Sequence, residues 1–401
     1  MERDIDVSTQ KSTMDIASDF RAHWREIIGV FLKLGAMSYG GPAIMGMMQA
    51  EVQEKRGWLS KENFVEGLGL VNMLPGPGAT QLGIFLGFTR GGWWGGVLAG
   101  LCFVLPALLI MLSLTWAYAT YGALPVMRGV FYGLAPVVVG IFAVAVWRLG
   151  RAAIKDAKQI GLTLATAAAL LFAPIDIIPL LLLAGALGVV FYGARRWGMA
   201  AVVILILGYG ALHVSGSLPP VTQTAAAGAV DVSEIAAFFF KVGAFTFGGG
   251  LSVLAFMQDQ VVNQLHWLTQ QQFLDGLALG QLTPGPVLMV AAFVGYQTSG
   301  VGGALIGAGA IFLPSFLLML SILPVFERIK RITWMKAALK GISPAVIGMI
   351  AVAMLQMLPK AVPDWLTGVL LVAVVALMLM RRSGPLPLML VGGAIGWLFS
   401  I

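Results

Sequence analysis

The stretch Lys33-Leu-Gly-Ala-Met-Ser-Tyr-Gly-Gly41 recurs as Lys241-Val-Gly-Ala-Phe-Thr-Phe-Gly-Gly249, and each copy opens a long apolar run. The two copies lie 208 residues apart (241 − 33). A second motif is also repeated, because Leu74-Pro-Gly-Pro77 corresponds to Thr283-Pro-Gly-Pro286 at an offset of 209 (284 − 75). An internal duplication of this length predicts two structural repeats within one chain.

The duplication continues on both sides of the Pro-Gly-Pro motif. Trp58 corresponds to Trp267, and Pro106 to Pro314. The segment Gly133-Leu-Ala-Pro136 has its partner in Gly341-Ile-Ser-Pro344. Four segments of each half are therefore duplicated, with one inserted residue in the second half between the first two motifs.

The composition predicts an all-α integral membrane protein. Of the 401 residues, 59% are hydrophobic and 11% are charged, and many apolar runs approach the 20 residues needed to cross about 30 Å of hydrocarbon. We count about thirteen candidate transmembrane helices, among them 27–50, 63–89 and 93–119. The single cysteine excludes an intramolecular disulfide, and the three scattered histidines predict no metal site and no cofactor.

This pattern predicts that the chain has three parts. Residues 1–214 are predicted to hold the first repeat plus extra spans, 215–232 a linker, and 233–401 the second repeat. Lysine and arginine in short loops favour a cytoplasmic N-terminus in the first half, but the basic loops change sides in the second half. An odd number of spans before the second copy also places the second repeat upside down relative to the first. We therefore expect inverted-topology repeats and a periplasmic C-terminus.

Glycine and proline inside the spans predict broken helices. Gly40-Gly41-Pro42 and Pro75-Gly76-Pro77 interrupt the backbone hydrogen bonding, and such breaks survive in a membrane where protein or a water-lined cavity pairs the released groups. Half-helix N-termini at such breaks present N–H groups to an anion. Kinks or close helix packing are the alternative explanation, which we favour for most of the other glycines.

The predicted substrate-binding residues lie in or beside these breaks in both repeats. They are Lys33, Ser38, Gly40, Gly41, Pro42, Asn72, Pro75, Gly76, Pro77, Thr80, Gln81, Lys241, Thr246, Gly248, Gly249, Gln281, Pro284, Gly285 and Pro286.

Charged residues inside the spans are few, and two pairs occupy equivalent repeat positions. Lys33 and Lys241 are predicted to flank one divalent anion, or else to reach from a span end to the interface. Glu66 and Asp275 are candidates for carrying a coupling proton, or else they cap or pair at a helix start.

The motifs resemble the chromate ion transporter family in its two-domain bacterial form, over nearly the whole chain. The resemblance rests on Leu34-Gly-Ala-Met-Ser-Tyr-Gly-Gly-Pro42, Leu74-Pro-Gly-Pro-Gly-Ala-Thr-Gln81 and Gly100-Leu-Cys-Phe-Val-Leu-Pro106, and on Phe245-Thr-Phe-Gly-Gly-Gly250 in the second copy. It implies a bacterial inner-membrane protein that exports chromate, confers chromate resistance and has sulfate as a related oxyanion. The sequence departs from the family pattern at Ile44, where a histidine is common, and at Gly250, which replaces the second proline.

The membrane potential agrees with export. With the inside negative, a dianion gains about 4.6 kcal/mol per 100 mV on leaving, so potential-driven transport and proton exchange both stay open. A carrier for sulfate or another oxyanion is the alternative, and a cation channel or exchanger is less favoured because the breaks lack carboxylates. The chain shows no constellation typical of an enzyme.

The predicted partners are chromate, sulfate and the lipid bilayer. A nucleic-acid partner is not expected, because the net charge of +7 comes from basic residues beside the spans. The oligomeric state is open, with a homodimer as one arrangement.

Overall fold

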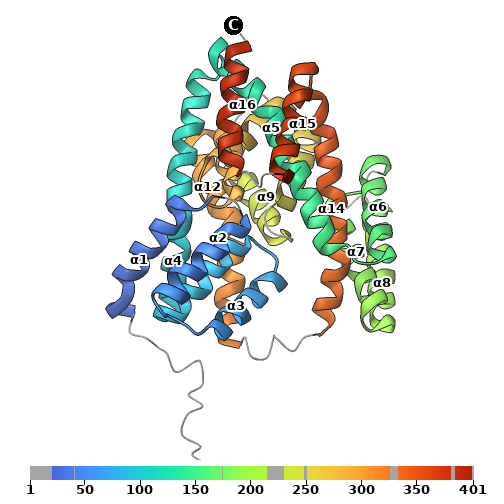
Figure 1. Ribbon diagram of the computed structural model, residues 1–401. Helices are drawn as coiled ribbons and strands as arrows, with labels where there is room; N and C mark the ends of the chain where they lie inside the picture. The colour runs from blue at the N-terminus through green and yellow to red at the C-terminus, as the bar shows by residue number, and fades with distance from the viewer. Residues whose placement is uncertain are drawn as a thin grey trace, which may run out of the picture.

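The computed structural model describes residues 20–39, 41–173, 175–214, 230–247, 251–325, 333–380 and 384–399. Within these ranges the chain is all-α, without strands, as predicted (Figure 1). The first half contains α1 (Phe20–Met37), α2 (Gly41–Met48), the π-helix η1 (Gln49–Lys55), α3 (Lys61–Met73), α4 (Gly78–Tyr121), α5 (Pro125–Ala153), α6 (Ala157–Phe172), α7 (Ile177–Tyr192) and α8 (Arg195–Val214). The second contains α9 (Val232–Ala244), α10 (Leu251–Met257), the π-helix η2 (Gln258–Gln264), α11 (Gln270–Leu282), η3 (Val287–Met289), α12 (Val290–Ile322), η4 (Leu323–Val325), α14 (Thr333–Ala361), α15 (Trp365–Met380) and α16 (Pro385–Phe399).

The helices repeat in the same order in both halves, further than the motifs alone revealed. The π-helices η1 and η2 begin 209 residues apart (258 − 49), which matches the offset of the Pro-Gly-Pro motifs. The last two helices also correspond, since α15 begins 208 residues after α6 (365 − 157) and α16 begins 208 residues after α7 (385 − 177). Only α8 among the described helices lacks a counterpart. The predicted linker at 215–232 lies largely outside the described residues.

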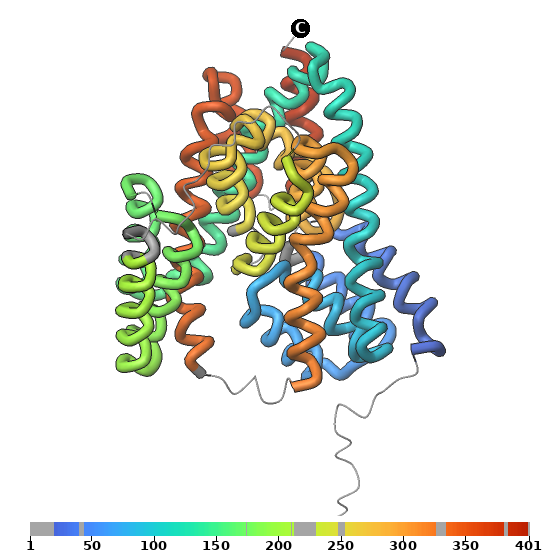
Figure 2. The backbone as a smooth tube through the Cα atoms, turned by 180° about the vertical axis from the view of Figure 1, so that it is seen from behind, coloured from blue at the N-terminus to red at the C-terminus, as the bar shows by residue number. Residues whose placement is uncertain are grey.

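The two repeats run in opposite directions. In Figure 1 the long helix α4 ends at the top, where it joins α5, whereas its counterpart α12 ends at the bottom. Figure 2 shows the same opposition from behind, with α12 in orange descending beside the rising α4 in cyan. α4 and α12 are in contact, and so are α5 and α14. The structure therefore has the inverted-repeat arrangement that the sequence predicted.

Each repeat begins with two helical hairpins, and a Pro-Gly-Pro motif lies at the tip of the second hairpin in each repeat. In the first hairpin α1 lies against η1, because Lys33 Nζ is 3.4 Å from Glu51 Oε2 and the rings of Phe31 and Trp58 are 6.3 Å apart. In the second hairpin α3 lies against the start of α4, so closely that a Cβ on Gly67 would overlap the ring of Phe85. Gly276 and Phe293 make the equivalent contact in the second repeat.

The long helices α4 and α12 also fold back on themselves. Their turns fall at Gly92 (φ 61°, ψ −151°) and at Gly300 (φ 63°, ψ −153°), a backbone conformation that L side chains rarely adopt. Beyond the turn, Gly95 packs directly on Gly87, eight residues earlier, and Gly303 packs on Gly295. Each of these helices thus has a first arm that completes a hairpin and a longer second arm.

The repeats exchange their last helix pairs. α16 of the second repeat packs on α5 of the first, and α7 of the first packs on α14 of the second. Both contacts are glycine-on-glycine, since Gly133 meets Gly392 and Gly396 while Gly341 meets Gly188. Small residues let helix backbones approach closely within a membrane. The halves are therefore intertwined rather than two separable domains.

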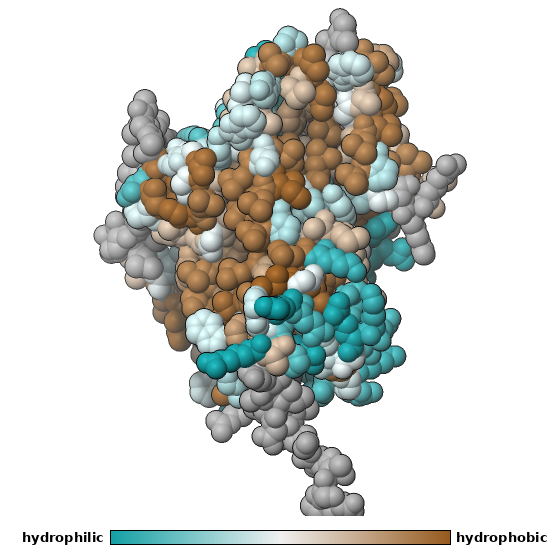
Figure 3. Space-filling view, turned by 90° about the vertical axis from the view of Figure 1, so that its left-hand side faces the viewer, coloured by the Kyte–Doolittle hydropathy of each residue, from teal (hydrophilic) through white to brown (hydrophobic). Residues whose placement is uncertain are grey.

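The surface agrees with a membrane environment. Four described helical stretches are long and apolar enough to span a bilayer, namely Gly78–Tyr121, Pro125–Ala153, Val287–Val325 and Trp334–Ala361. α6, α7, α15 and α16 are shorter apolar helices. In Figure 3 a broad hydrophobic surface lies above a hydrophilic region at the lower end, where the first hairpins have their base.

Predicted spans that carry the glycine and proline motifs differ from the observed structure. The predicted spans 27–50 and 63–89 are hairpins, whose arms return toward the side from which they came. A hairpin arm and a transmembrane helix have the same hydrophobicity, so composition did not distinguish them. The predicted total of about thirteen transmembrane helices stays a prediction.

We predict that Gly35→Leu will destabilise the protein, because any Cβ at Gly35 would collide with the carbonyl oxygen of Phe103 in the second arm of α4. Overpacking of this kind costs about 1–3 kcal/mol. The melting temperature of the purified protein in detergent should fall by several degrees. Gly29→Leu on the same helix is the control, since nothing lies within 4 Å of a Cβ at Gly29. Equal melting of both variants would contradict the close packing of α1 on α4.

Candidate functional site

The tips of the hairpins meet across the interface between the repeats through two reciprocal hydrogen bonds. The backbone N–H of Gly76 donates to the carbonyl oxygen of Thr246 at 2.6 Å, and the N–H of Gly285 donates to the carbonyl oxygen of Ser38, also at 2.6 Å. Gly76 and Gly285 are the central residues of the two Pro-Gly-Pro motifs, and Ser38 and Thr246 stand at the same position of the first motif. The helix breaks of both repeats therefore converge at one place.

Only glycine suits the centre of each Pro-Gly-Pro motif. Gly76 has φ +130° and Gly285 has φ +102°, and a Cβ at either position would collide with neighbouring side chains, including one from the opposite repeat. At Gly76 it would meet Ser315 Oγ and the Gln81 side chain, and at Gly285 it would meet Ala107 Cβ. Pro75 is half-buried, whereas Pro77, Pro284 and Pro286 are buried at the same tips.

The hydroxyl groups of Ser38 and Thr246 are already engaged. Each donates to the carbonyl oxygen four residues earlier, Ser38 to Leu34 and Thr246 to Val242, the latter at 2.8 Å. Both residues are buried. In this conformation they join the tips through their backbone carbonyls, while their side chains satisfy the ends of α1 and α9.

The first turn of α4 places polar side chains beside the first Pro-Gly-Pro tip. Thr80 and Gln81 are fully buried, and Gln81 Nε2 donates to the carbonyl oxygen of Pro75 at 2.6 Å. Thr80 Oγ1 and Gln81 Oε1 have no hydrogen-bond partner among the described residues. Buried polar groups without a partner are uncommon in proteins, so they point to a ligand or water at this tip.

Of the remaining predicted residues, some have exposed or half-buried side chains, two begin α2, and three lie outside the described part of the chain. The side chain of Lys33 is 51% exposed and paired with Glu51, and Lys241 is exposed as well. Asn72 is exposed and Gln281 is half-buried. Gly41 and Pro42 begin α2. The predicted residues Gly40, Gly248 and Gly249 lie outside the described part of the chain.

The two candidate proton carriers have different environments. Asp275 on α11 is buried, with 7% of its surface exposed, whereas Glu66 on α3 is exposed. Asp275 accepts a hydrogen bond from Tyr118 Oη at 2.8 Å and another from Gln271 Nε2 at 2.9 Å. Tyr118 belongs to the first repeat, so this contact also crosses the interface. Sequence reasoning missed Tyr118, although a polar aromatic residue in an apolar span was an available signal.

An ionic network closes the base of the first hairpin. Glu26 Oε2 is 2.8 Å from Arg90 Nη2, and Glu26 Oε1 is 3.0 Å from Arg56 Nη1 and accepts from Trp58 Nε1 at 3.1 Å. Burial would raise the pKa of Glu26, but the hydrogen bonds from Arg90 and Trp58 and the charge of Arg90 outweigh it and hold that pKa below its usual value. The network ties α1 to η1 and to the turn of α4.

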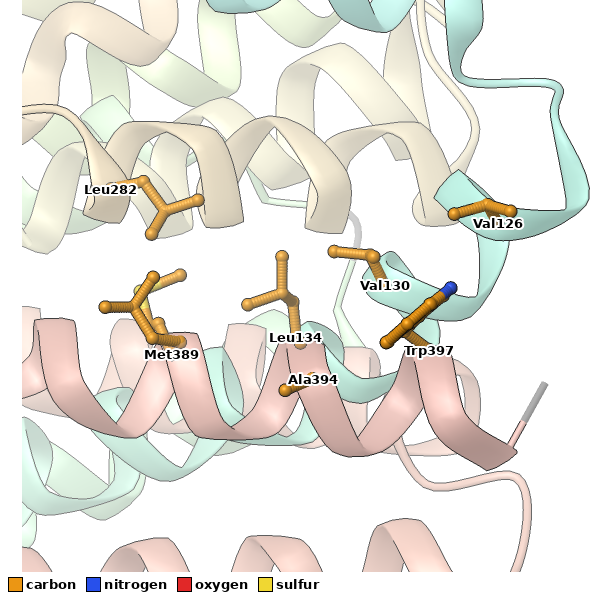
Figure 4. Close-up of a pocket in the computed structure, with 9 residues that line it drawn as sticks. Val126, Val130, Leu134, Leu282, Met389, Ala394 and Trp397 are labelled. Atoms are coloured by element: carbon orange, nitrogen blue, oxygen red, sulfur yellow. The ribbon is translucent and has the colours of Figure 1, made fainter. Parts of the chain in front are cut away.

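A separate cavity of about 290 Å³ is lined only by apolar side chains (Figure 4). Val126, Val130 and Leu134 of α5 face Leu282 of α11, while Met389 and Trp397 line it from α16. It offers an oxyanion neither a charge nor a cluster of hydrogen-bond donors. The hairpin tips, with their buried polar groups, are the better candidate site.

Inverted repeats, helix breaks that meet at the repeat interface, and an apolar surface define a membrane protein of the secondary-transporter type. A family model described as Chromate transporter matches residues 25–191 and again 233–397. The chain belongs to the chromate transporter family.

Curated relatives match over most of their length. The chain is 32% identical to the chromate transport protein of Cupriavidus metallidurans, over 92% of each chain. It is 34% identical to the probable chromate transport protein of Synechococcus elongatus, over 92% of this chain and 94% of the relative. The chromate transport protein of Pseudomonas aeruginosa is 29% identical over 93% of this chain and 92% of its own length. No solved structure matches the chain.

We predict that Glu26→Gln will lower the stability of the protein at neutral pH by about 1 kcal/mol, because Arg90 and Arg56 lose their shared carboxylate. A carboxylate whose folded-state pKa is lowered stabilises the protein above the ordinary glutamate pKa and loses this effect as the pH falls through the folded value. The difference in melting temperature between wild type and variant should therefore shrink on acidification below about pH 4.5.

The matched control is Glu234→Gln, at the equivalent position of the second repeat, where the side chain is exposed. Its melting temperature should stay near that of the wild type. A pH-independent difference for Glu26→Gln would show that the lost interaction is packing rather than charge.

Proposed function

We propose that this protein exports chromate from the cytoplasm across the bacterial inner membrane and so confers chromate resistance. The observation that carries the proposal is the convergence of the helix breaks at Gly76, Thr246, Gly285 and Ser38 in a member of the chromate transporter family. The names of three curated relatives refer to chromate transport and support the substrate. We infer transport without enzymatic chemistry.

The outward direction follows from charge. A dianion leaving a cell with a negative interior gains about 4.6 kcal/mol per 100 mV, so export requires no coupled ion, whereas accumulation would require several. We place the N-terminus in the cytoplasm and the C-terminus in the periplasm, because basic loops of the first half lie on the N-terminal side. Figure 1 supports the opposite placement of the two ends, since α1 starts low and the C-terminus lies at the top.

Lys33 and Lys241 would attract the anion toward the tips rather than bind it there. Each precedes its Ser38 or Thr246 partner by five residues, which is roughly 7.5 Å of helix rise. Both are exposed, so their charge acts through water and mainly raises the local anion concentration.

Sulfate is the competing substrate, because it shares the tetrahedral shape and charge of chromate. A cation channel or exchanger is disfavoured by the tips, where the described side chains are hydroxyls, an amide and apolar groups rather than carboxylates. Sulfate competition within the transport assay separates the two oxyanions.

Chromate flux into inside-out vesicles tests the function. Vesicles carrying the protein should accumulate chromate when the lumen is positive, and excess sulfate should compete weakly. Vesicles without the protein are the control. Accumulation of sulfate but not chromate would support the alternative oxyanion carrier, and accumulation of neither would reject oxyanion export.

Proton exchange, where it contributes, would pass through Asp275 rather than Glu66. Asp275 is enclosed and held by Tyr118 of the opposite repeat, so adding a proton would change a contact between the two repeats. An exposed carboxylate such as Glu66 exchanges protons with water without such a consequence.

We predict that Asp275→Asn will abolish the response of chromate flux to a pH gradient and leave flux driven by the potential, because an amide cannot take up a proton. Measurements with the potential and the pH gradient collapsed separately check this. Glu66→Gln is the matched control and should keep the wild-type response. A wild-type response in Asp275→Asn would remove this residue from the coupling mechanism.

A further inference from the structure

Ser315, in the second arm of α12, is a buried hydroxyl that the protein itself leaves unpaired. It is fully buried, and its Oγ has no hydrogen-bond partner among the described residues. Several buried hydroxyls near the tips bond instead to the carbonyl oxygen four residues earlier, as Thr115 does to Met111 at 2.7 Å and Thr283 does to Leu279 at 2.8 Å. Ser315 is therefore available to a group that the chain does not supply.

The position of Ser315 directs it to the first Pro-Gly-Pro tip. A Cβ at Gly76 would stand 2.4 Å from the Oγ of Ser315 and 2.3 Å from Gln81 Nε2. Gln81 is held there by its hydrogen bond to the carbonyl oxygen of Pro75. The absent side chain of Gly76 thus lets two hydrogen-bond donors from opposite repeats come together.

The first turn of α4 adds further polar groups to this tip. The first N–H groups of a helix have no partner within the helix, and the partial positive charge of a helix N-terminus favours an anion. Thr80, whose hydroxyl is buried and unpartnered, belongs to the same turn. The hydroxyl of Ser315, the second N–H of Gln81 Nε2 and a helix N-terminus are donors of the kind that a tetrahedral oxyanion requires.

The equivalent place in the second repeat is apolar. Ala107 stands where Ser315 does, 208 residues earlier (315 − 107), and its methyl group faces Gly285. The turn that follows the second Pro-Gly-Pro motif reads Val287-Leu-Met-Val290 instead of Gly78-Ala-Thr-Gln81. The Pro-Gly-Pro turn is present at both tips, but the polar groups are present at one.

From this asymmetry we propose that the protein binds one tetrahedral oxyanion per chain, at the Gly76 tip, with Ser315 as a ligand from the second repeat and Gln81 and the first turn of α4 from the first. The second tip, at Gly285, is a structural partner without a substrate site. This inference rests on the proposed function and specifies where its substrate binds. Because the ligands come from both repeats, any movement of one repeat against the other changes the site.

Equilibrium binding to the purified protein in detergent, with chromate as the probe, tests the proposal. The wild type should bind one chromate per chain. Ser315→Ala, which installs the residue found at the other tip, should weaken binding about tenfold or more, as expected for a lost hydrogen bond to a charged group. Its melting temperature without chromate should equal or exceed that of the wild type, because the deleted hydroxyl has no protein partner.

Thr115→Ala is the matched control, since it removes a buried hydroxyl that is bonded within its own helix. It should bind chromate with wild-type affinity. Adding Ala107→Ser to Ser315→Ala should not restore binding, because the second tip lacks the other donors.

Several outcomes would overturn the assignment. Wild-type affinity in Ser315→Ala would place the site elsewhere while leaving chromate transport intact. A stoichiometry of two per chain, or rescue by Ala107→Ser, would show two equivalent sites. A wild-type protein that binds no oxyanion would reject the proposed function itself.

Discussion

The requirement that every backbone polar group be paired in a hydrocarbon environment governs this structure. Glycine and proline interrupt helices near the middle of the molecule, as at Pro75-Gly76-Pro77 and Pro284-Gly285-Pro286, and each interruption releases N–H and carbonyl groups that lipid cannot satisfy. The two repeats resolve this for each other, because Gly76 donates to Thr246 and Gly285 donates to Ser38. Breaks that would be costly in an isolated helix become the contacts that join the halves.

The same constraint explains why the repeats are intertwined. The second arms of α4 and α12 pack on each other, and the exchanged pairs α6–α7 and α15–α16 cover α14 and α5 of the opposite repeat. In a membrane the hydrophobic effect does not drive helices together, so close packing of small residues and hydrogen bonds must hold them. Glycine contacts such as Gly133 with Gly396 supply that packing. Separated halves would expose both the tips and these faces to lipid.

Function is expected where the two repeats differ. The first repeat carries the ionic network of Glu26 and the polar turn of Thr80 and Gln81, whereas the second carries the buried Asp275. A duplicated scaffold provides two similar backbones, and different side chains on them allow each repeat to have a separate role. The proposed substrate and proton positions fall in different repeats, and each also uses a residue from the other repeat, Ser315 or Tyr118.

The sequence alone was sufficient to predict the duplication, the all-α membrane class and the location of the helix breaks, because these depend on composition, periodicity and the local chemistry of glycine and proline. It also determined the chromate transporter family through motifs that lie at the tips. The three-dimensional structure was needed to show that 27–50 and 63–89 fold back as hairpins, because a hairpin arm and a transmembrane helix have the same apolar pattern. It also showed that the hydroxyls of Ser38 and Thr246 are bonded within their helices while Ser315 is unpaired. Hydrogen-bond pairing depends on which distant segments meet, and no local signal in the sequence encodes that meeting.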